Sequence, residues 1–209
     1  LSGQSAQAKN SWEQVLKLDP LHQNALYQLS LIYKNAEDYI KAEAYIDRLV
    51  YQMPDHAHYL KTRAYIKSHL SKSIEAFDSY AKAYKLNSGD LDLIVALADI
   101  FHNNKQYNES DSLIAIGLGL DGQHFKLRKM QLEACYSLGY YEHSILLLEE
   151  MRETPYFNNY FRRMLGICYI QQEKFAAALS VLQTIEEPDH NEEYTFYYLS
   201  RAYLGLGDM

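Results

Sequence analysis

The chain has 209 residues, of which 48% are hydrophobic and 22% charged, and its formal net charge is −7. This is the composition of an ordinary globular protein with a sizeable core. No segment approaches the roughly 18 consecutive apolar residues that a membrane span requires, and the acidic balance weighs against nucleic acid, whose phosphates are bound by Lys and Arg. We therefore expect a soluble protein that neither inserts into membranes nor binds nucleic acid, and its compartment stays open.

A small residue returns every 34 positions along the whole chain. The column consists of Ala8, Ala42, Ala76, Ser110, Ser144 and Ala178. A fixed period of this length indicates a stack of helix–turn–helix units. Counted from Gln23, the units are a half repeat 1–22, full repeats 23–56, 57–90, 91–124, 125–158 and 159–192, and a half repeat 193–209.

Each full repeat is expected to contain two helices. The first covers about the first fourteen repeat positions, and the second runs from about position 17 to 30. In chain order the helices are expected near 5–18, 23–36, 39–52, 57–70, 73–86, 91–104, 107–120, 125–138, 141–154, 159–172, 175–188 and 193–206. Proline near position 32, as at Pro20 and Pro54, cannot continue the second helix because it lacks an N–H donor.

Small residues at positions 8 and 20 let the two helices of a pair approach closely, and a large side chain there would overpack the contact. Two repeats fit this pattern poorly. Arg63 and Lys67 fall at core positions of the second full repeat, as do Arg128 and Gln131 in the fourth. The packing is then expected to fall to Leu60, Ala64 and Tyr65, and to Leu127, Met130 and Ala134. Charged residues of the second helix in the first full repeat, including Glu43 and Asp47, are expected to face solvent.

Other columns keep the same phase. Position 11 reads Tyr33, Lys67, Phe101, Cys135, Tyr169 and Tyr203, and position 17 is aromatic in four of its six copies. The segment Gln172–Phe175, together with Gly166, Tyr169 and Ala178, is the best single match to the tetratricopeptide repeat, which the entire chain resembles. The resemblance implies an all-α fold, a right-handed superhelical α-solenoid of antiparallel helix pairs.

The resemblance also implies a non-enzymatic protein-interaction scaffold whose first helices line a concave groove for a peptide or partner protein. The expected groove residues are rich in Tyr, with Lys, Arg and Asn among them, and Tyr and Arg are enriched at binding hot spots, although the 20 tyrosines in the chain make a compositional origin equally open. They are Asn24, Tyr27, Lys34, Lys61, Tyr65, Asp99, Lys129, Tyr136, Tyr160, Arg163, Tyr194, Tyr197 and Arg201. Chaperone-binding members use a Lys and Asn clamp that no three consecutive repeats supply here, so a chaperone tail is not the expected ligand.

No enzyme motif is present, and we expect no cofactor. His56 and His58 form a His-x-His pair, but a third metal ligand is missing, so no metal site is predicted. Cys135 and Cys168 occupy core positions, and we expect both to be reduced and inert.

Two other roles stay open. In the first, the chain is a structural or self-assembling solenoid that forms homo-oligomers through exposed end helices. In the second, it is a sensor or regulatory module of a larger protein. Both ends fall in the same inter-helix turn, with Gly3 and Gly207 at position 15, so we expect an excerpt from a longer solenoid.

Overall fold

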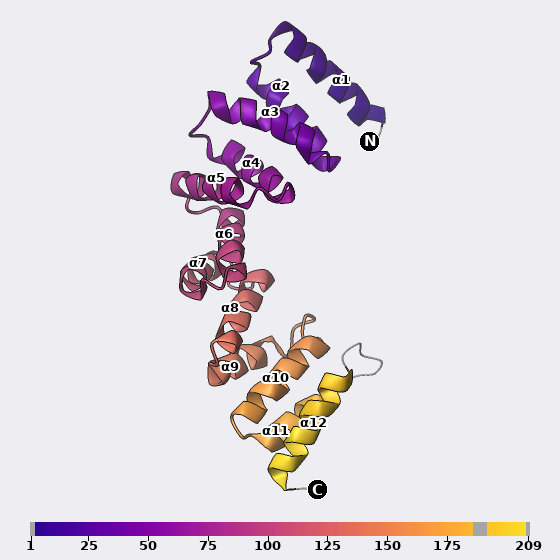
Figure 1. The fold of residues 1–209 in the computed structure, drawn as a ribbon, viewed down its shortest axis with the longest axis vertical. Coiled ribbons are helices and arrows are strands. Elements are labelled where there is room, and N and C mark those ends of the chain that lie inside the picture. Colours follow the sequence, from indigo (N-terminus) through magenta and orange to yellow (C-terminus); the bar gives the residue numbers. More distant parts are fainter. Residues whose placement is uncertain (1–2, 186–191, 208–209) are drawn as a thin grey trace. The chain divides into compact units, whose positions relative to one another are not determined.

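The computed structural model describes residues 3–185 and 192–207, and within them it contains twelve helices and no strand (Figure 1). Each helix lies where the repeat predicts it, except that α9 and α11 end early, at Met151 and Leu182. Pro155 accounts for the first of these, because the residue before a proline disfavours helical geometry. The helices are α1 Gly3–Leu18, α2 Gln23–Asn35, α3 Tyr39–Gln52, α4 Ala57–His69, α5 Ser73–Leu86, α6 Leu91–Asn103, α7 Tyr107–Leu120, α8 Phe125–Ser137, α9 Tyr141–Met151, α10 Asn159–Gln171, α11 Phe175–Leu182 and α12 Glu192–Leu206.

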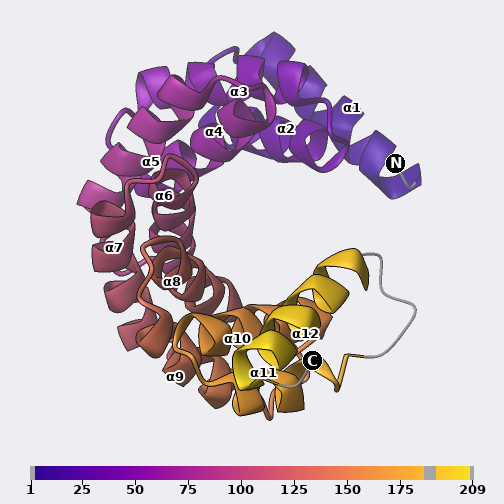
Figure 2. The same cartoon turned by 60° about the horizontal axis from the view of Figure 1, so that its bottom comes forward.

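The chain divides into two compact units, Leu1–Gly122 and Gln123–Met209, at the border between the third and fourth full repeats. In the first unit α2, α4 and α6 form an inner layer, and α3, α5 and α7 form an outer layer (Figure 2). In the second unit α8, α10 and α12 are the inner helices, and α9 and α11 the outer ones. That all repeats together form one solenoid stays a prediction.

The small column is buried in the five full repeats, as predicted, whereas Ala8 on the first helix is exposed. Ala42, Ser110 and Ala178, at position 20, are fully buried. The Ser110 hydroxyl donates a hydrogen bond to the Ala98 carbonyl at position 8 of the facing helix, with an O···O distance of 3.0 Å. Small side chains at these two positions therefore let the helices of this pair approach closely.

The turn between the two helices of a repeat has a feature that the sequence does not reveal. Position 15 has a positive φ in the five full repeats and in the last half repeat, at Glu37, Ser71, Lys105, Gly139, Glu173 and Gly207. In the five full repeats the N–H of position 16 bonds back to the carbonyl of position 11, for example Gln106 to Phe101 at 2.9 Å. This is the Schellman helix ending, whose left-handed residue is most often glycine.

Lys105→Gly is therefore expected to stabilise the first unit by about 0.5–1 kcal/mol, because glycine adopts a positive φ without a Cβ clash. The measurement is urea unfolding followed by circular dichroism. Gly139→Ala, at the same position of the fourth full repeat, is the reciprocal control and should destabilise by a similar amount. A loss of stability in Lys105→Gly would contradict this account of the turn.

The second full repeat departs from the predicted packing. Leu60 and Ala64 are buried as expected, but Tyr65 is 41% exposed, and Lys67 is 3% exposed in the core position itself. The Lys67 ammonium lies 2.5 Å from Glu43, 2.9 Å from Asp47 and 2.8 Å from Glu75. The expectation that Glu43 and Asp47 face solvent is therefore wrong for Glu43, whose side chain is 15% exposed, and incomplete for Asp47.

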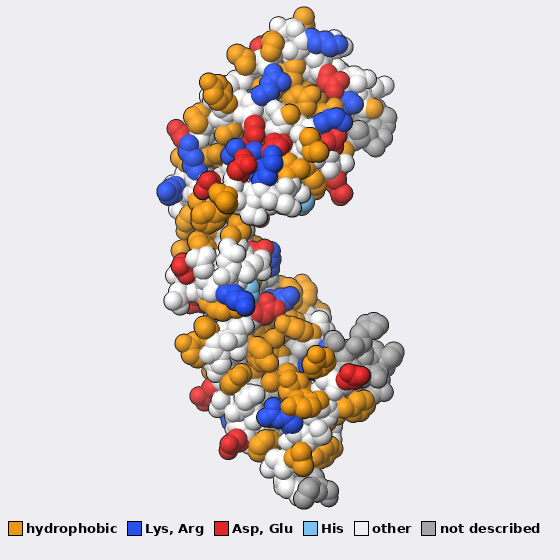
Figure 3. All heavy atoms as spheres, in the orientation of Figure 1, with side chains coloured by type: hydrophobic (Ala, Val, Ile, Leu, Met, Phe, Trp, Pro, Cys, Tyr) orange, Lys and Arg blue, Asp and Glu red, His pale blue; other side chains and the backbone are white. Residues whose placement is uncertain are grey.

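These charges form one network between neighbouring repeats, which we call the Lys67 cluster: Lys67, Glu43, Asp47, Glu75, Arg63 and Lys72. Arg63 pairs with Asp47 at 2.7 Å, and Lys72 pairs with Glu43 at 2.7 Å. Figure 3 shows acidic and basic side chains gathered between α3 and α5 on this face. Three acids and three bases balance, which is why a lysine can replace an aromatic residue inside the stack.

Acid should weaken the Lys67 cluster. Burial alone would raise the pKa of Glu43, but hydrogen bonds from Lys67 and Lys72 lower it overall. A carboxyl with a lowered folded-state pKa stabilises the fold above its unfolded pKa, about 4.3, and this contribution is lost as pH falls through the folded pKa. We expect the melting temperature to fall more steeply from about pH 5 to pH 3 in wild type than in Glu43→Gln. Parallel curves would mean that Glu43 titrates normally.

The fourth full repeat packs as predicted. Leu127, Met130 and Ala134 are buried, while Arg128 turns outward to Glu150 at 3.4 Å. Both cysteines are free thiols, Cys168 fully buried and Cys135 only partly so. Burial raises the pKa of the Cys168 thiol to about 12, so at neutral pH it is not a nucleophile.

Candidate functional site

The candidate surface is the set of seams where consecutive inner helices of one unit meet. In the first of them, between α2 and α4, aromatic side chains close the surface. The Tyr27 hydroxyl is hydrogen-bonded to His58 Nε2, and the ring centroids of Tyr27 and Tyr59 are 5.1 Å apart. His56 stacks on Tyr59 with ring centroids 3.8 Å apart. These two histidines therefore serve aromatic packing, and no group of three or more His, Cys, Asp or Glu side chains among the described residues could hold a metal ion.

The next seam, between α4 and α6, is closed by charge. The Lys61 ammonium lies 2.9 Å from both carboxylate oxygens of Asp90 and 2.7 Å from Asp92. Burial alone would lower the pKa of Lys61, but these two hydrogen-bonded carboxylates raise it overall. Lys61 is thus committed to partners within the chain.

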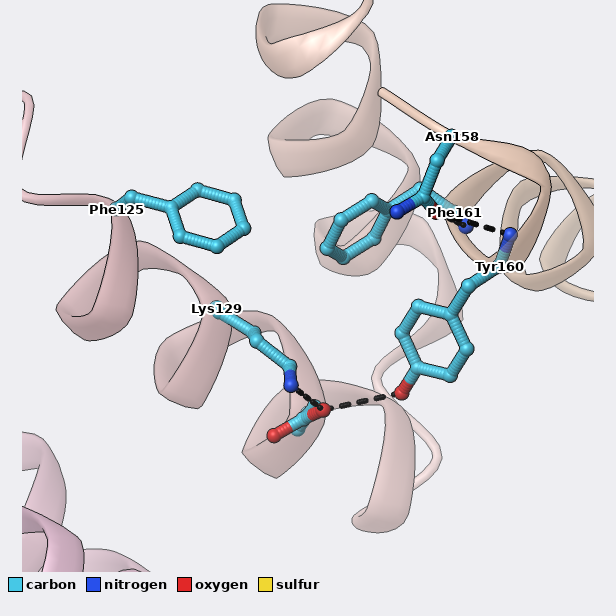
Figure 4. Close-up of a pocket in the computed structure, with 6 residues that line it drawn as sticks. Phe125, Lys129, Asn158, Tyr160 and Phe161 are labelled. Atoms are coloured by element: carbon cyan, nitrogen blue, oxygen red, sulfur yellow. Dashed lines mark hydrogen bonds and ion pairs between the residues drawn. The ribbon is translucent and has the colours of Figure 1, made fainter. Parts of the chain in front are cut away.

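The seam between α8 and α10, in the second unit, is open. A pocket of about 340 Å³ lies there, and Figure 4 shows the side chains around it. Its volume is at the lower end of the range for ligand sites, which suits one or two side chains of a partner. The pocket is lined by Phe125, Lys129, Glu133, Asn158, Tyr160 and Phe161.

The local sequence explains how these residues meet. Asn158 caps α10: its side-chain oxygen accepts hydrogen bonds from the backbone N–H groups of Tyr160 at 3.0 Å and Phe161 at 3.4 Å. Phe161 turns into the core, and Phe125 meets it edge-on with centroids 6.2 Å apart. The cap thus places an amide beside an aromatic wall made of one residue from each helix.

Polar groups form the other side of the pocket. The Tyr160 hydroxyl donates to Glu133 at 3.0 Å, and Lys129 lies 3.6 Å from the same carboxylate and 5.9 Å from the Tyr160 ring centroid. Burial and the nearby Glu133 raise the pKa of Tyr160 to about 12, so this phenol stays protonated and keeps donating at neutral pH. The pocket therefore combines an apolar wall with a cation, a carboxylate, a phenol and an amide.

The predicted groove residues differ in exposure. Tyr65, Tyr160, Tyr194 and Tyr197 are between 41% and 63% exposed. Asn24 and Arg201 are also exposed, and Tyr27, Lys34, Lys61, Asp99, Lys129 and Tyr136 are partly buried. Arg163 is 9% exposed, so its guanidinium is not presented at the surface, unlike the other members of the set.

The structure brings some of these residues together in pairs. Lys129 and Tyr160 share the open pocket, and the Lys34 ammonium lies 5.3 Å from the Tyr65 ring centroid. Phe125, Asn158 and Phe161 were not predicted, because only one face of the first helix in each repeat was expected to line the groove. The available signal was Asn158 at position 34, an N-cap residue two positions before the predicted groove residue Tyr160.

Comparison with known proteins supports the fold. Residues 23–56, the first full repeat, match the family model described as tetratricopeptide repeat. No curated protein matches the sequence. No described helix has the length and apolar character needed to cross a membrane.

Several solved structures share the architecture. A tetratricopeptide repeat protein from Parabacteroides merdae has a TM-score of 0.68 and 15% identity, over 99% of this chain and 82% of its own. YrrB, described as a TPR protein with an unusual peptide-binding site, has a TM-score of 0.75 and 14% identity, over 89% and 96%. PilW, described as a widely conserved type IV pilus biogenesis factor, has a TM-score of 0.61 and 15% identity, over 89% and 86%. At these identities the likeness shows the fold alone.

Proposed function

Because the chain is a tetratricopeptide repeat protein, we propose that it is a non-enzymatic scaffold that binds an extended segment of a partner protein on its inner helices. The observation that carries this proposal is the open pocket between α8 and α10, where an aromatic wall faces convergent polar groups. Small apolar pockets with a few fixed polar groups are typical ligand sites. The description of YrrB as having a peptide-binding site supports the same class of ligand.

The exposed tyrosines of the second unit extend this surface. Tyr160 on α10 and Tyr194 and Tyr197 on α12 are 43%, 63% and 55% exposed, although tyrosine is usually more buried. A tyrosine contributes a large apolar area with few rotatable bonds, and its hydroxyl can bond a peptide backbone. These three residues are therefore the proposed contacts beyond the pocket.

The test is selection from a random peptide library displayed on phage, with the immobilised chain as bait. We expect wild type to enrich peptides whose binding falls at least tenfold when Tyr160, Tyr194 and Tyr197 are replaced by alanine. The control replaces Tyr51, which is 90% exposed on the outer helix α3, and should bind like wild type. Failure to enrich any peptide, or equal losses in both variants, would refute binding on the inner helices.

Self-association is a second candidate function, favoured by one observation on α12. Phe196, at repeat position 4, is 56% exposed, whereas Leu26, Leu60 and Ile94 at the same position are 0–3% exposed. A second copy that covered this face would bury an aromatic ring. Light scattering over a range of concentrations should then show association that Phe196→Lys abolishes, and a monomer at all concentrations would exclude it.

A further inference from the structure

The repeats provide an internal comparison for the open pocket. Lys61 and Lys129 both occupy position 5 of an inner helix, and each lies beside the N-terminus of the next inner helix in its unit. The residues that face them, at position 34 and at position 2 of the following repeat, are Asp90 and Asp92 in one seam and Asn158 and Tyr160 in the other. The lysine at position 5 therefore faces two carboxylates in the first unit. In the second unit the residues at positions 34 and 2 carry no carboxylate.

The two N-caps are otherwise alike. Asp90 accepts hydrogen bonds from Asp92 N at 3.0 Å and Leu93 N at 3.3 Å, which correspond to the bonds that Asn158 makes with the second and third residues of α10. Asp and Asn are about equally good N-caps. Helix capping thus does not explain why one seam has a carboxylate and the other a neutral amide.

The two lysines also differ in exposure, in the direction that the facing carboxylates predict. The Lys61 side chain is 25% exposed, and Lys129 is 42% exposed. Among the described residues Lys129 pairs with Glu133 on its own helix, at 3.6 Å, and that carboxylate already accepts the Tyr160 hydroxyl at 3.0 Å. In the second unit Asn158 stands where the first unit has the carboxylate of Asp90. The pocket is the space between Asn158 and Lys129.

We propose that the pocket between α8 and α10 binds an aspartate or glutamate side chain of the partner segment, with an adjacent aromatic residue against Phe125, whose ring rests on the buried Phe161. This inference rests on the proposed function and specifies its ligand. The partner's carboxylate takes the place that Asp90 and Asp92 fill beside Lys61. Lys129 supplies the charge, and the side-chain amide of Asn158 supplies an uncharged N–H donor.

The apolar side of the pocket argues for a ring beside the acid. Phe125 is only partly buried and stacks on Tyr156 with centroids 4.4 Å apart, and Phe161 meets it edge-on. Aromatic rings prefer such offset and edge-on neighbours, and a small pocket leaves room for little else. An internal acidic–aromatic pair in an extended segment meets both requirements, and it needs no free chain end.

The test uses three short peptides measured by NMR titration of the labelled full chain. The probe is acetyl-Gly-Asp-Phe-Gly-amide, its neutral counterpart has Asn for Asp, and the third, acetyl-Gly-Gly-Phe-Gly, has a free terminal carboxylate. We expect the Asp probe to bind with a Kd on the order of 1 mM, as a fragment of this size can, and at least about fivefold tighter than the Asn peptide. The shifts should centre on the pocket residues.

Three variants make the result specific. Lys129→Met keeps the aliphatic stem and removes the cation, so the preference for Asp should vanish. Asn158→Asp keeps the helix cap and reproduces the closed seam of the first unit, so it should abolish the preference without loss of stability. Lys126→Met, on the same helix but outside the pocket lining, changes the net charge equally and should keep the preference.

Equal binding of the Asp and Asn peptides, or no binding of either, would overturn the inference. Tightest binding of the free-terminus peptide would also overturn it, because the recognised group would then be a chain end. The phage selection decides the proposed function separately. If it enriches peptides that need the exposed tyrosines but carry no acidic–aromatic pair, the scaffold function stands and only the ligand is wrong.

Discussion

Lys67→Ala should lower the free energy of unfolding of the first unit by about 3 kcal/mol. Removing one partner of a buried ion pair typically costs 3–5 kcal/mol, because the remaining charge is buried without compensation. Here the lower end applies, since the side chains of Asp47 and Glu75 are 37% and 48% exposed and keep their contacts with Arg63. The acid that loses most is Glu43, whose side chain is 15% exposed and which keeps only Lys72 at 2.7 Å.

The chain itself contains the matched replacement. Glu43 occupies position 21 and packs on position 11 of the next repeat, Lys67. One repeat later the same two positions hold Phe77 and Phe101, whose rings meet edge-on with centroids 5.7 Å apart. The double variant Glu43→Phe and Lys67→Phe therefore transplants a pair that already works in this fold. Replacing buried ion pairs by packed apolar residues is often neutral or stabilising, so most of the stability lost in Lys67→Ala should return.

Urea unfolding followed by circular dichroism and by the fluorescence of Trp12, the single tryptophan, measures both variants. Trp12 lies on α1 and reports on the first unit, and a repeat protein can unfold in parts, so the two signals are compared rather than averaged. If Lys67→Ala unfolded like wild type, the Lys67 cluster would have no role in stacking. If the double variant were no better than the single one, the two repeat interfaces would not be interchangeable.

The cluster shows where sequence reasoning succeeds and where it stops. The 34-residue period predicts nearly every helix, because each repeat must bury the same columns against its neighbours. It also marks Arg63 and Lys67 as misfits in those columns. It does not predict that Glu43, Asp47 and Glu75 converge on Lys67 from the two neighbouring outer helices, because that depends on rotamers and on the angle between repeats.

The open pocket also depends on side chains of different helices, which the repeat pattern does not place. Lys61 and Lys129 are indistinguishable by repeat position, and both were predicted as groove residues. What separates them lies at the last position of the same repeat, where Asp90 corresponds to Asn158. An Asp-to-Asn difference at a helix cap is neutral for the helix, so periodicity and propensity both pass over it. The site depends on Lys129, Asn158 and Tyr160, which belong to two repeats, and only the structure shows that they line one pocket.

Gly166→Leu should destabilise the second unit by about 3 kcal/mol, the upper end of the cost of overpacking a core. Gly166 is position 8 of α10, where the two helices of the repeat are closest. A Cβ at this residue would lie 2.5 Å from Cγ and Cδ2 of Leu182 on α11, closer than real carbon atoms approach. The helix pair would have to separate, or Leu182 leave its rotamer, and Leu182 is 1% exposed in the core.

The control for this substitution is Gly119→Leu. Gly119 also lies within a helix, α7, but a Cβ there meets nothing within 4 Å. Leucine is a better helix former than glycine by somewhat under 1 kcal/mol, so this variant should be neutral or slightly stabilised. The two substitutions are chemically identical, and opposite signs in urea unfolding would isolate the contact with Leu182 from helix propensity.

A second substitution, at Leu182, tests the same contact from the facing helix. Adding Leu182→Ala to Gly166→Leu moves the isobutyl group from α11 to α10 and nearly conserves the core volume, so the double variant should be more stable than Gly166→Leu alone. Leu182→Ala by itself leaves a cavity and should cost about 2–5 kcal/mol. A double variant whose loss equalled the sum of the two single losses would show no coupling between positions 8 and 24. Position 8 of this repeat would then not owe its small residue to the facing helix.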